Sequence, residues 1–70
     1  MADQITITAN GKEYSLTSGI TLAGFMSENN IAAEKTVAAV NGDIIKRDET
    51  ASCVLADGDK LELMTFAGGG

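Results

Sequence analysis

Apolar and polar residues alternate along the first part of the chain. Ile5 and Ile7 alternate with threonines, and the alternation resumes at Tyr14 after the pair Asn10-Gly11. An Asn-Gly pair between two alternating segments is typical of a β-hairpin, because a type I′ turn requires positive φ at both central residues. The pattern therefore predicts two antiparallel strands within residues 4–16.

The period changes in the next segment. Leu22, Phe25 and Met26 are spaced i, i+3 and i+4, which places them on one face of a helix. Thr21 is suited to cap the helix N-terminus, and the Asn-Asn pair at 29–30 is suited to end it, since Asn tolerates the left-handed conformation. We expect one main helix here.

Strand-like patterns return in the second half of the chain. Val37 and Val40 flank two alanines, the Asn-Gly pair at 41–42 predicts a turn, and a short strand is expected from Ile44. We interpret residues 48–59 as a connection with Val54 and Leu55 as its apolar anchors, leading through a turn into a last strand at 60–64. The expected order is β-β-α-β-β-β, a two-layer α+β fold with the helix packed on one face of the sheet.

Composition excludes several classes of site. The chain has 70 residues, of which 44% are hydrophobic, so it can form one small core. A single cysteine and no histidine exclude a disulfide framework, four-cysteine metal sites, and Ser-His-Asp or Cys-His catalysis. We therefore expect no metal site and no enzyme activity of the chain alone.

Charge and hydropathy limit the partners. Ten acidic and five basic residues give a net charge of −5, so we expect no nucleic-acid partner, whose phosphates would be repelled. The acidic charge fits a partner with a basic surface, or simply solubility. No apolar run is long enough to span a membrane and no signal segment is evident, which predicts a cytoplasmic protein without a membrane partner.

The last third of the chain carries a specific combination of motifs. Ala39, Asn41, Ile44 and Arg47 follow the pattern A-x-N-x-x-I-x-x-R, and "LADGDKLELMTFAGGG" contains a D-G-D turn, an alternating strand and terminal glycines. In these features the sequence resembles the ThiS family, the ubiquitin-like sulfur carrier proteins of thiamin biosynthesis. The resemblance implies a β-grasp domain with a mixed sheet of four to five strands over residues 1–64, and a flexible tail over residues 65–70. The tail has three glycines where the family needs two.

The resemblance also implies a reaction and its partners. The carboxylate of Gly70 would be adenylated with ATP by an E1-like, ThiF-like adenylyltransferase. Sulfur from a cysteine desulfurase-derived persulfide would then convert it to a thiocarboxylate, which donates sulfur to a ThiG-like thiazole synthase. Because Gly70 is the last residue, we expect no processing step. The chain has no phosphate-binding loop motif, so we expect ATP to bind the partner and no cofactor to bind the carrier.

The tail is the expected site of partner contact. The predicted partner-binding residues are Phe66, Ala67, Gly68, Gly69 and Gly70. Without a Cβ, a glycine backbone can lie close to the wall of a partner's active site. For Phe66 two interpretations stay open, an anchor for the tail or packing in the core at the end of the last strand.

Two other features favour structural interpretations. An isolated cysteine is usually a small buried hydrophobe, so we expect Cys53 to be structural. The Asp57–Asp59 segment lacks the remaining ligands of a calcium loop and is predicted to be a turn.

Other functions remain open from the sequence. The same carboxylate chemistry could serve MoaD-like molybdopterin synthesis or cysteine synthesis. A ubiquitin-like modifier would transfer the carboxylate to lysine amines, and a passive binding module would not use its tail at all.

Overall fold

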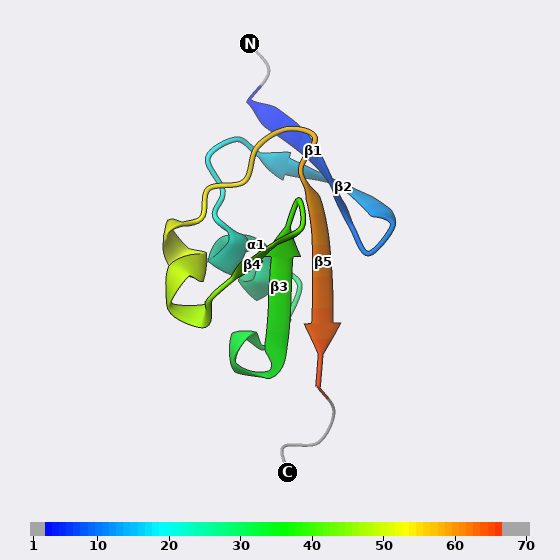
Figure 1. Ribbon diagram of the computed structural model, residues 1–70. Helices are drawn as coiled ribbons and strands as arrows, with labels where there is room; N and C mark the ends of the chain where they lie inside the picture. Colours follow the sequence, from blue (N-terminus) through cyan, green and yellow to red (C-terminus); the bar gives the residue numbers. More distant parts are fainter. Residues whose placement is uncertain (1–2, 67–70) are drawn as a thin grey trace.

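A computed structural model describes residues 3–66 of the chain (Figure 1). The elements in chain order are β1 (Gln4–Ala9), β2 (Lys12–Thr17), α1 (Leu22–Glu28), η1 (Ala33–Lys35), β3 (Thr36–Val40), β4 (Asp43–Ile45), η2 (Arg47–Ser52) and β5 (Lys60–Thr65). The labels η1 and η2 denote short 3₁₀ helices. The predicted order of strands and main helix is confirmed.

The strands form one five-stranded mixed sheet in the order β2-β1-β5-β3-β4. The last strand lies at the centre, parallel to β1 and antiparallel to β3. The helix α1 lies on one side of the sheet, behind β3 and β4 in the view of Figure 1. The predicted fold class, an α+β β-grasp with one main helix on one face of a mixed sheet, is confirmed.

The core lies between α1 and the covered face of the sheet. Leu22, Phe25 and Met26 are buried, as the helical spacing predicted, and they join Ile7 and Leu61 from the sheet. The rings of Tyr14 and Phe25 meet edge to face with their centroids 5.1 Å apart. At this size nearly every large buried side chain belongs to this one cluster, so the helix cannot detach without exposing the core.

The turns follow the local sequence signals. Asn10 and Gly11 have φ of 52° and 83°, and Asn41 and Gly42 have φ of 53° and 89°, as a type I′ hairpin turn requires. The Thr21 hydroxyl oxygen accepts a hydrogen bond from the Gly24 amide at 3.0 Å, which confirms the predicted N-cap.

The connection between β4 and β5 differs from the prediction. Its first part is the helix η2, and the predicted anchor Val54 is 61% exposed while Leu55 is 3% exposed. The Leu55 amide donates to the Ile20 carbonyl at 2.9 Å, which aims its side chain into the core. Adjacent residues of an extended segment point to opposite sides, so only one of the two apolar neighbours can be buried.

The end of the described chain continues the sheet. β5 runs to Thr65, one residue beyond the predicted strand, and the Phe66 amide donates to the Lys35 carbonyl at 2.7 Å. The remaining predicted tail residues, 67–70, lie outside the described residues. Within residues 3–66, no helix has the length and apolar character needed to span a membrane.

Candidate docking surface and C-terminal site

The strand β5 is the last element of the chain and lies at the centre of the sheet. Leu61 is fully buried, whereas Glu62 and Met64 are exposed on the opposite face of the sheet. Phe66 continues the ladder with β3, so strand alternation places its side chain on the same face as Met64. That face is the open one, because α1 covers the other.

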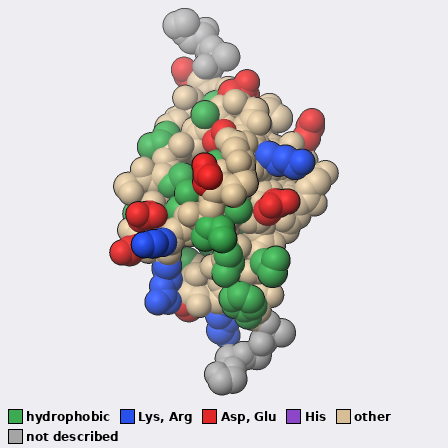
Figure 2. Space-filling view, in the orientation of Figure 1, with side chains coloured by type: hydrophobic (Ala, Val, Ile, Leu, Met, Phe, Trp, Pro, Cys, Tyr) green, Lys and Arg blue, Asp and Glu red, His purple; other side chains and the backbone are tan. Residues whose placement is uncertain are grey.

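Four exposed hydrophobic side chains, which we call the apolar sheet surface, lie on this open face. They are Val37, Ile44, Met64 and Phe66, and their exposed fractions are 37%, 71%, 66% and 54%. Ile44 lies opposite Ala39 in the sheet register, and Val37 lies opposite Met64. Figure 2 shows hydrophobic side chains gathered on this face toward the end of the molecule where β5 finishes.

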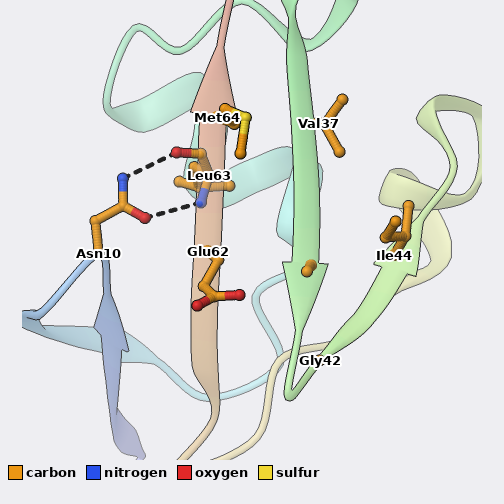
Figure 3. A pocket seen from close by; sticks show the side chains of 8 residues that line it. Asn10, Val37, Gly42, Ile44, Glu62, Leu63 and Met64 are labelled. Atoms are coloured by element: carbon orange, nitrogen blue, oxygen red, sulfur yellow. Dashed lines mark hydrogen bonds between the residues drawn. The ribbon is translucent and has the colours of Figure 1, made fainter.

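A shallow groove of about 520 Å³ crosses the same region. It is lined by Asn10, Val37, Ala39, Gly42, Ile44, Glu62, Leu63 and Met64. Figure 3 shows Glu62 projecting from the middle of β5, between Asn10 on one side and β3 on the other. The groove is therefore apolar with one carboxylate in it.

The other half of the open face has a different character. On the β1–β2 hairpin, the exposed positions are polar: Gln4, Thr6, Glu13, Ser15 and Thr17. Alternation with polar residues outward is the ordinary pattern for a solvated sheet face. The apolar half on β5, β3 and β4 departs from that pattern, and clustered exposed hydrophobics of this kind mark interaction sites.

Asn10 pairs with the backbone of β5 through its side chain. Its Oδ1 accepts from the Leu63 amide at 2.9 Å, and its Nδ2 donates to the Leu63 carbonyl at 3.0 Å (Figure 3). The sequence predicted Asn10 only as a turn residue. The sequence gives only a weak signal for this contact with β5, because the tolerance of Asn for positive φ already explains an Asn at this turn position.

Asn41 holds the beginning of β5 in a similar way. Its Oδ1 accepts from the Lys60 amide at 3.0 Å, and its Nδ2 donates to Asp59 Oδ1 at 2.9 Å. Asp59 Oδ2 accepts from the Ala56 amide at 2.8 Å, and Asp57 Oδ1 accepts from the Thr6 amide at 2.7 Å. Asp59 thus closes the turn and Asp57 ties it to β1. Gly58 between them has a φ of 87°, which confirms the turn interpretation of this segment.

Cys53 lies at the edge of the core. It packs against the buried cluster, and its carbonyl accepts from the Leu22 amide at 2.8 Å. Burial, together with the nearby carboxylates of Asp59 and Glu49, raises the pKa of the Cys53 thiol above its ordinary value. A raised pKa disfavours the reactive thiolate, which agrees with the structural role expected for this residue.

Among the predicted site residues, Phe66 is the one within the described part of the chain. At 54% exposure it does not pack in the core, so the core interpretation is wrong and the anchor interpretation stays a prediction. The Phe66 side chain is exposed because side chains alternate along β5, and those of the even-numbered residues face away from α1. Ala67, Gly68, Gly69 and Gly70 lie outside the described residues.

The sheet order, with a central last strand between β1 and β3 and one helix across one face, defines a ubiquitin-like β-grasp protein. An exposed apolar half-face lies at the end of the sheet where β5 finishes and is a candidate docking surface. Comparison with known families narrows this class. The ThiS family matches residues 1–70, and the chain belongs to this family.

Solved structures and a curated relative agree with that assignment. The crystal structure of a thiamine biosynthesis protein (ThiS) from Geobacter metallireducens is similar with a TM-score of 0.79 and 28% identity, covering 94% of this chain and 100% of that one. An NMR solution structure of a thiamine biosynthesis protein from the same organism gives a TM-score of 0.76 at 28% identity, covering 94% and 88%.

The curated relative is a longer protein. It is a thiazole synthase of Paramagnetospirillum magneticum, 30% identical over 64 residues that make up 91% of this chain. The chain spans only 20% of the length of that relative.

Proposed function

We propose that this protein is the sulfur carrier of thiamin biosynthesis and that the carboxylate of Gly70 carries the sulfur as a thiocarboxylate. The observation that carries the proposal is the ThiS family match, which extends over residues 1–70 and so includes the glycine tail. The apolar sheet surface supports it, because a carrier needs a surface that docks on its partners while the tail reaches their active sites.

The chemistry requires partners at each step. A carboxylate is a poor electrophile, so an E1-like adenylyltransferase first joins it to the α-phosphate of ATP and releases pyrophosphate. The terminal sulfur of a cysteine persulfide, generated by a cysteine desulfurase, attacks the acyl-adenylate and displaces AMP. A thiol reductant then cleaves the remaining S–S bond and leaves the thiocarboxylate on Gly70.

Glycine suits the end of such a carrier. Its backbone fits a narrow channel and adopts either sign of φ, while ordering it costs about 1–2 kcal/mol per residue. Contact made by the folded domain has to offset that cost. The apolar sheet surface ends at Phe66, immediately before Ala67, so docking there would deliver the tail directly to a partner.

A thiazole synthase is the partner that we assign to the apolar sheet surface. The segment that matches this chain makes up 20% of the similar thiazole synthase of Paramagnetospirillum magneticum, so that protein is about five times as long as the segment. A carrier-like segment and that enzyme can therefore occur in one polypeptide, which supports a working contact between the two.

The test is a mass measurement of the C-terminal peptide. The protein is incubated with ATP, an adenylyltransferase of this pathway, a persulfide donor and a thiol reductant. Fragment ions of this peptide have to place the added mass on Gly70, because replacing oxygen by sulfur has the same nominal mass as oxidation of a methionine, and Met64 lies in the same peptide. We expect the sulfur on Gly70, and none when ATP is omitted or when Gly69 and Gly70 are deleted.

Other results would contradict the proposal in distinguishable ways. A ladder of isopeptide conjugates on a denaturing gel would show a protein modifier. An unmodified tail with a partner that activates a known carrier would leave a passive binding module.

A further inference from the structure

Glu62 is the one residue with an ionisable side chain among those that line the apolar groove (Figure 3). It lies in the middle of β5, and its register partner on β3 is Ala39. Ala39 in turn pairs with Ile44 on β4. Because paired residues point to the same face of a sheet, these three side chains form one row across the open face. The methyl group of Ala39 lies between the carboxylate and the larger side chain of Ile44.

A second row of aliphatic side chains flanks the first. Val37 and Met64 are register partners, each two positions from its neighbour in the first row, so their side chains point to the same face. Both line the groove, as Ala39 does. The groove is thus deepest in side-chain terms at Ala39, where the smallest side chain of the two rows leaves room next to the Glu62 carboxylate.

The groove itself offers no countercharge to Glu62. Within residues 3–66, none of the side chains that line the groove is basic. Lys60 is the preceding residue on the same face of β5 and lies outside the groove lining. The neighbouring Asn10 directs its side-chain amide to the backbone of Leu63. Since Glu62 is exposed, water solvates its carboxylate in the free domain.

Docking through the apolar sheet surface would remove this water. An ionised carboxylate that is buried without a partner is strongly destabilising, whereas a hydrogen-bonded cation offsets the lost solvation. A protein that covers this surface therefore has to supply a cation. The aliphatic surroundings favour a guanidinium over an ammonium group, because the guanidinium is more weakly hydrated and its planar fork can bind both carboxylate oxygens.

We propose that Glu62 binds an arginine side chain of the thiazole synthase, with the guanidinium in the groove beside Ala39. The proposal rests on the proposed carrier function, which assigns that enzyme to the apolar sheet surface. The apolar side chains then supply contact area, and the ion pair fixes the orientation in which the two proteins dock. A pair buried in this way is screened by salt much less than a pair of exposed charges.

Glu13 offers a matched control. It is exposed on β2, on the polar half of the same open face, where its register partner is Thr8. Glu62→Gln and Glu13→Gln remove the same charge and keep the length of the side chain. A difference between the two variants therefore depends on the position of the charge, since the net charge changes equally.

The first experiment measures binding to a purified thiazole synthase by isothermal titration calorimetry, with Tm as the check on folding. We expect Glu62→Gln to raise the dissociation constant about thirtyfold or more, and Glu13→Gln to leave it within about twofold. Tm should stay close to that of the wild type in both variants. Ala39→Leu fills the space beside the carboxylate and should raise the dissociation constant about tenfold or more while Glu62 is intact.

A second experiment identifies the partner group. The synthase is treated with phenylglyoxal, which modifies arginine, alone and with a saturating amount of the carrier, and the modified residues are located by peptide mass. We expect the wild-type carrier to protect one arginine that the Glu62→Gln carrier leaves reactive. Replacing that arginine by alanine should weaken binding by a similar factor, and Glu62→Gln should then have little further effect.

Three kinds of result would overturn the inference. Equal weakening by Glu62→Gln and Glu13→Gln would assign the effect to net charge. Unchanged binding in Glu62→Gln or Ala39→Leu, or an arginine whose loss adds independently to that of Glu62, would show that no guanidinium occupies the groove. A wild type that gains sulfur on Gly70 but does not bind the synthase would remove this partner and keep the carrier function. Failure of both would remove the carrier function as well.

Discussion

Individual exposed side chains carry most of the argument for docking. Ile44 and Met64 are 71% and 66% exposed and lie within one groove, whereas Val54 is 61% exposed outside it. A single exposed hydrophobic residue is normal on any protein surface. Ile44 and Val54 therefore differ in their neighbours: Ile44 lies in the apolar groove and Val54 lies outside it. Their effects on binding can be compared by substitution.

Replacing Ile44 by lysine should weaken binding to a purified thiazole synthase by about tenfold or more, because a charge at the centre of an apolar contact must be desolvated. Val54→Lys introduces the same charge at a similarly exposed position and should leave the dissociation constant unchanged. Isothermal titration calorimetry measures both. Equal weakening by the two variants would indicate a charge effect, and no weakening by Ile44→Lys would place the contact elsewhere.

The Cys53 thiol should react slowly in the native protein. Because its pKa is raised in the folded state, the native chain holds the thiol proton more tightly than the unfolded chain does. The contribution of the protonated Cys53 thiol to the free energy of unfolding is complete below the pKa of the unfolded chain. It is lost as pH rises through the pKa of the folded chain. At pH about 8, alkylation by iodoacetamide should be slower than in urea-unfolded protein. Equal rates in the folded and the unfolded protein would contradict the raised pKa.

The structural role of Cys53 also predicts that the variant Cys53→Ala retains thiocarboxylate formation.

At the scale of elements, the local sequence predicts secondary structure where the conformation of a segment depends on its own residues. Asn10-Gly11 predicted the first hairpin, and the spacing of Leu22, Phe25 and Met26 predicted α1. The 3₁₀ helices could not be predicted, because three to six residues are too few to show a period. The contact of Asn10 with Leu63 spans 53 positions and depends on strand pairing, which no local pattern contains.

The β3–β4 hairpin presents Ile44 and depends on Gly42. At φ of +89° a Cβ on Gly42 would meet no heavy atom within 4 Å, so the cost of Gly42→Ala is backbone strain alone. We expect it to lower the free energy of unfolding by about 1–2 kcal/mol. Gly42→Asn should cost less, since Asn tolerates this region. Urea denaturation measures both, and an unchanged midpoint in Gly42→Ala would contradict the strain.

At the scale of the whole molecule, charge and apolar area are separated. The chain carries a net charge of −5, yet the groove contains one ionisable side chain, Glu62. The sequence alone favoured solubility as the role of the acidic charge, with attraction to a basic partner as the alternative. The arrangement on the open face supports the first role, because Glu62 is the one charged side chain among the residues that line the groove.

Docking through this surface should therefore depend weakly on salt. Between about 0.05 and about 0.5 M NaCl, screening removes most attraction between exposed charges, whereas contact between apolar groups persists. We expect the dissociation constant for a thiazole synthase to change by less than about threefold, with a negative heat-capacity change on binding. Glu62→Gln should remove most of the remaining salt dependence. A loss of affinity of about tenfold or more over this range in the wild type would instead assign docking to the acidic surface and a basic partner.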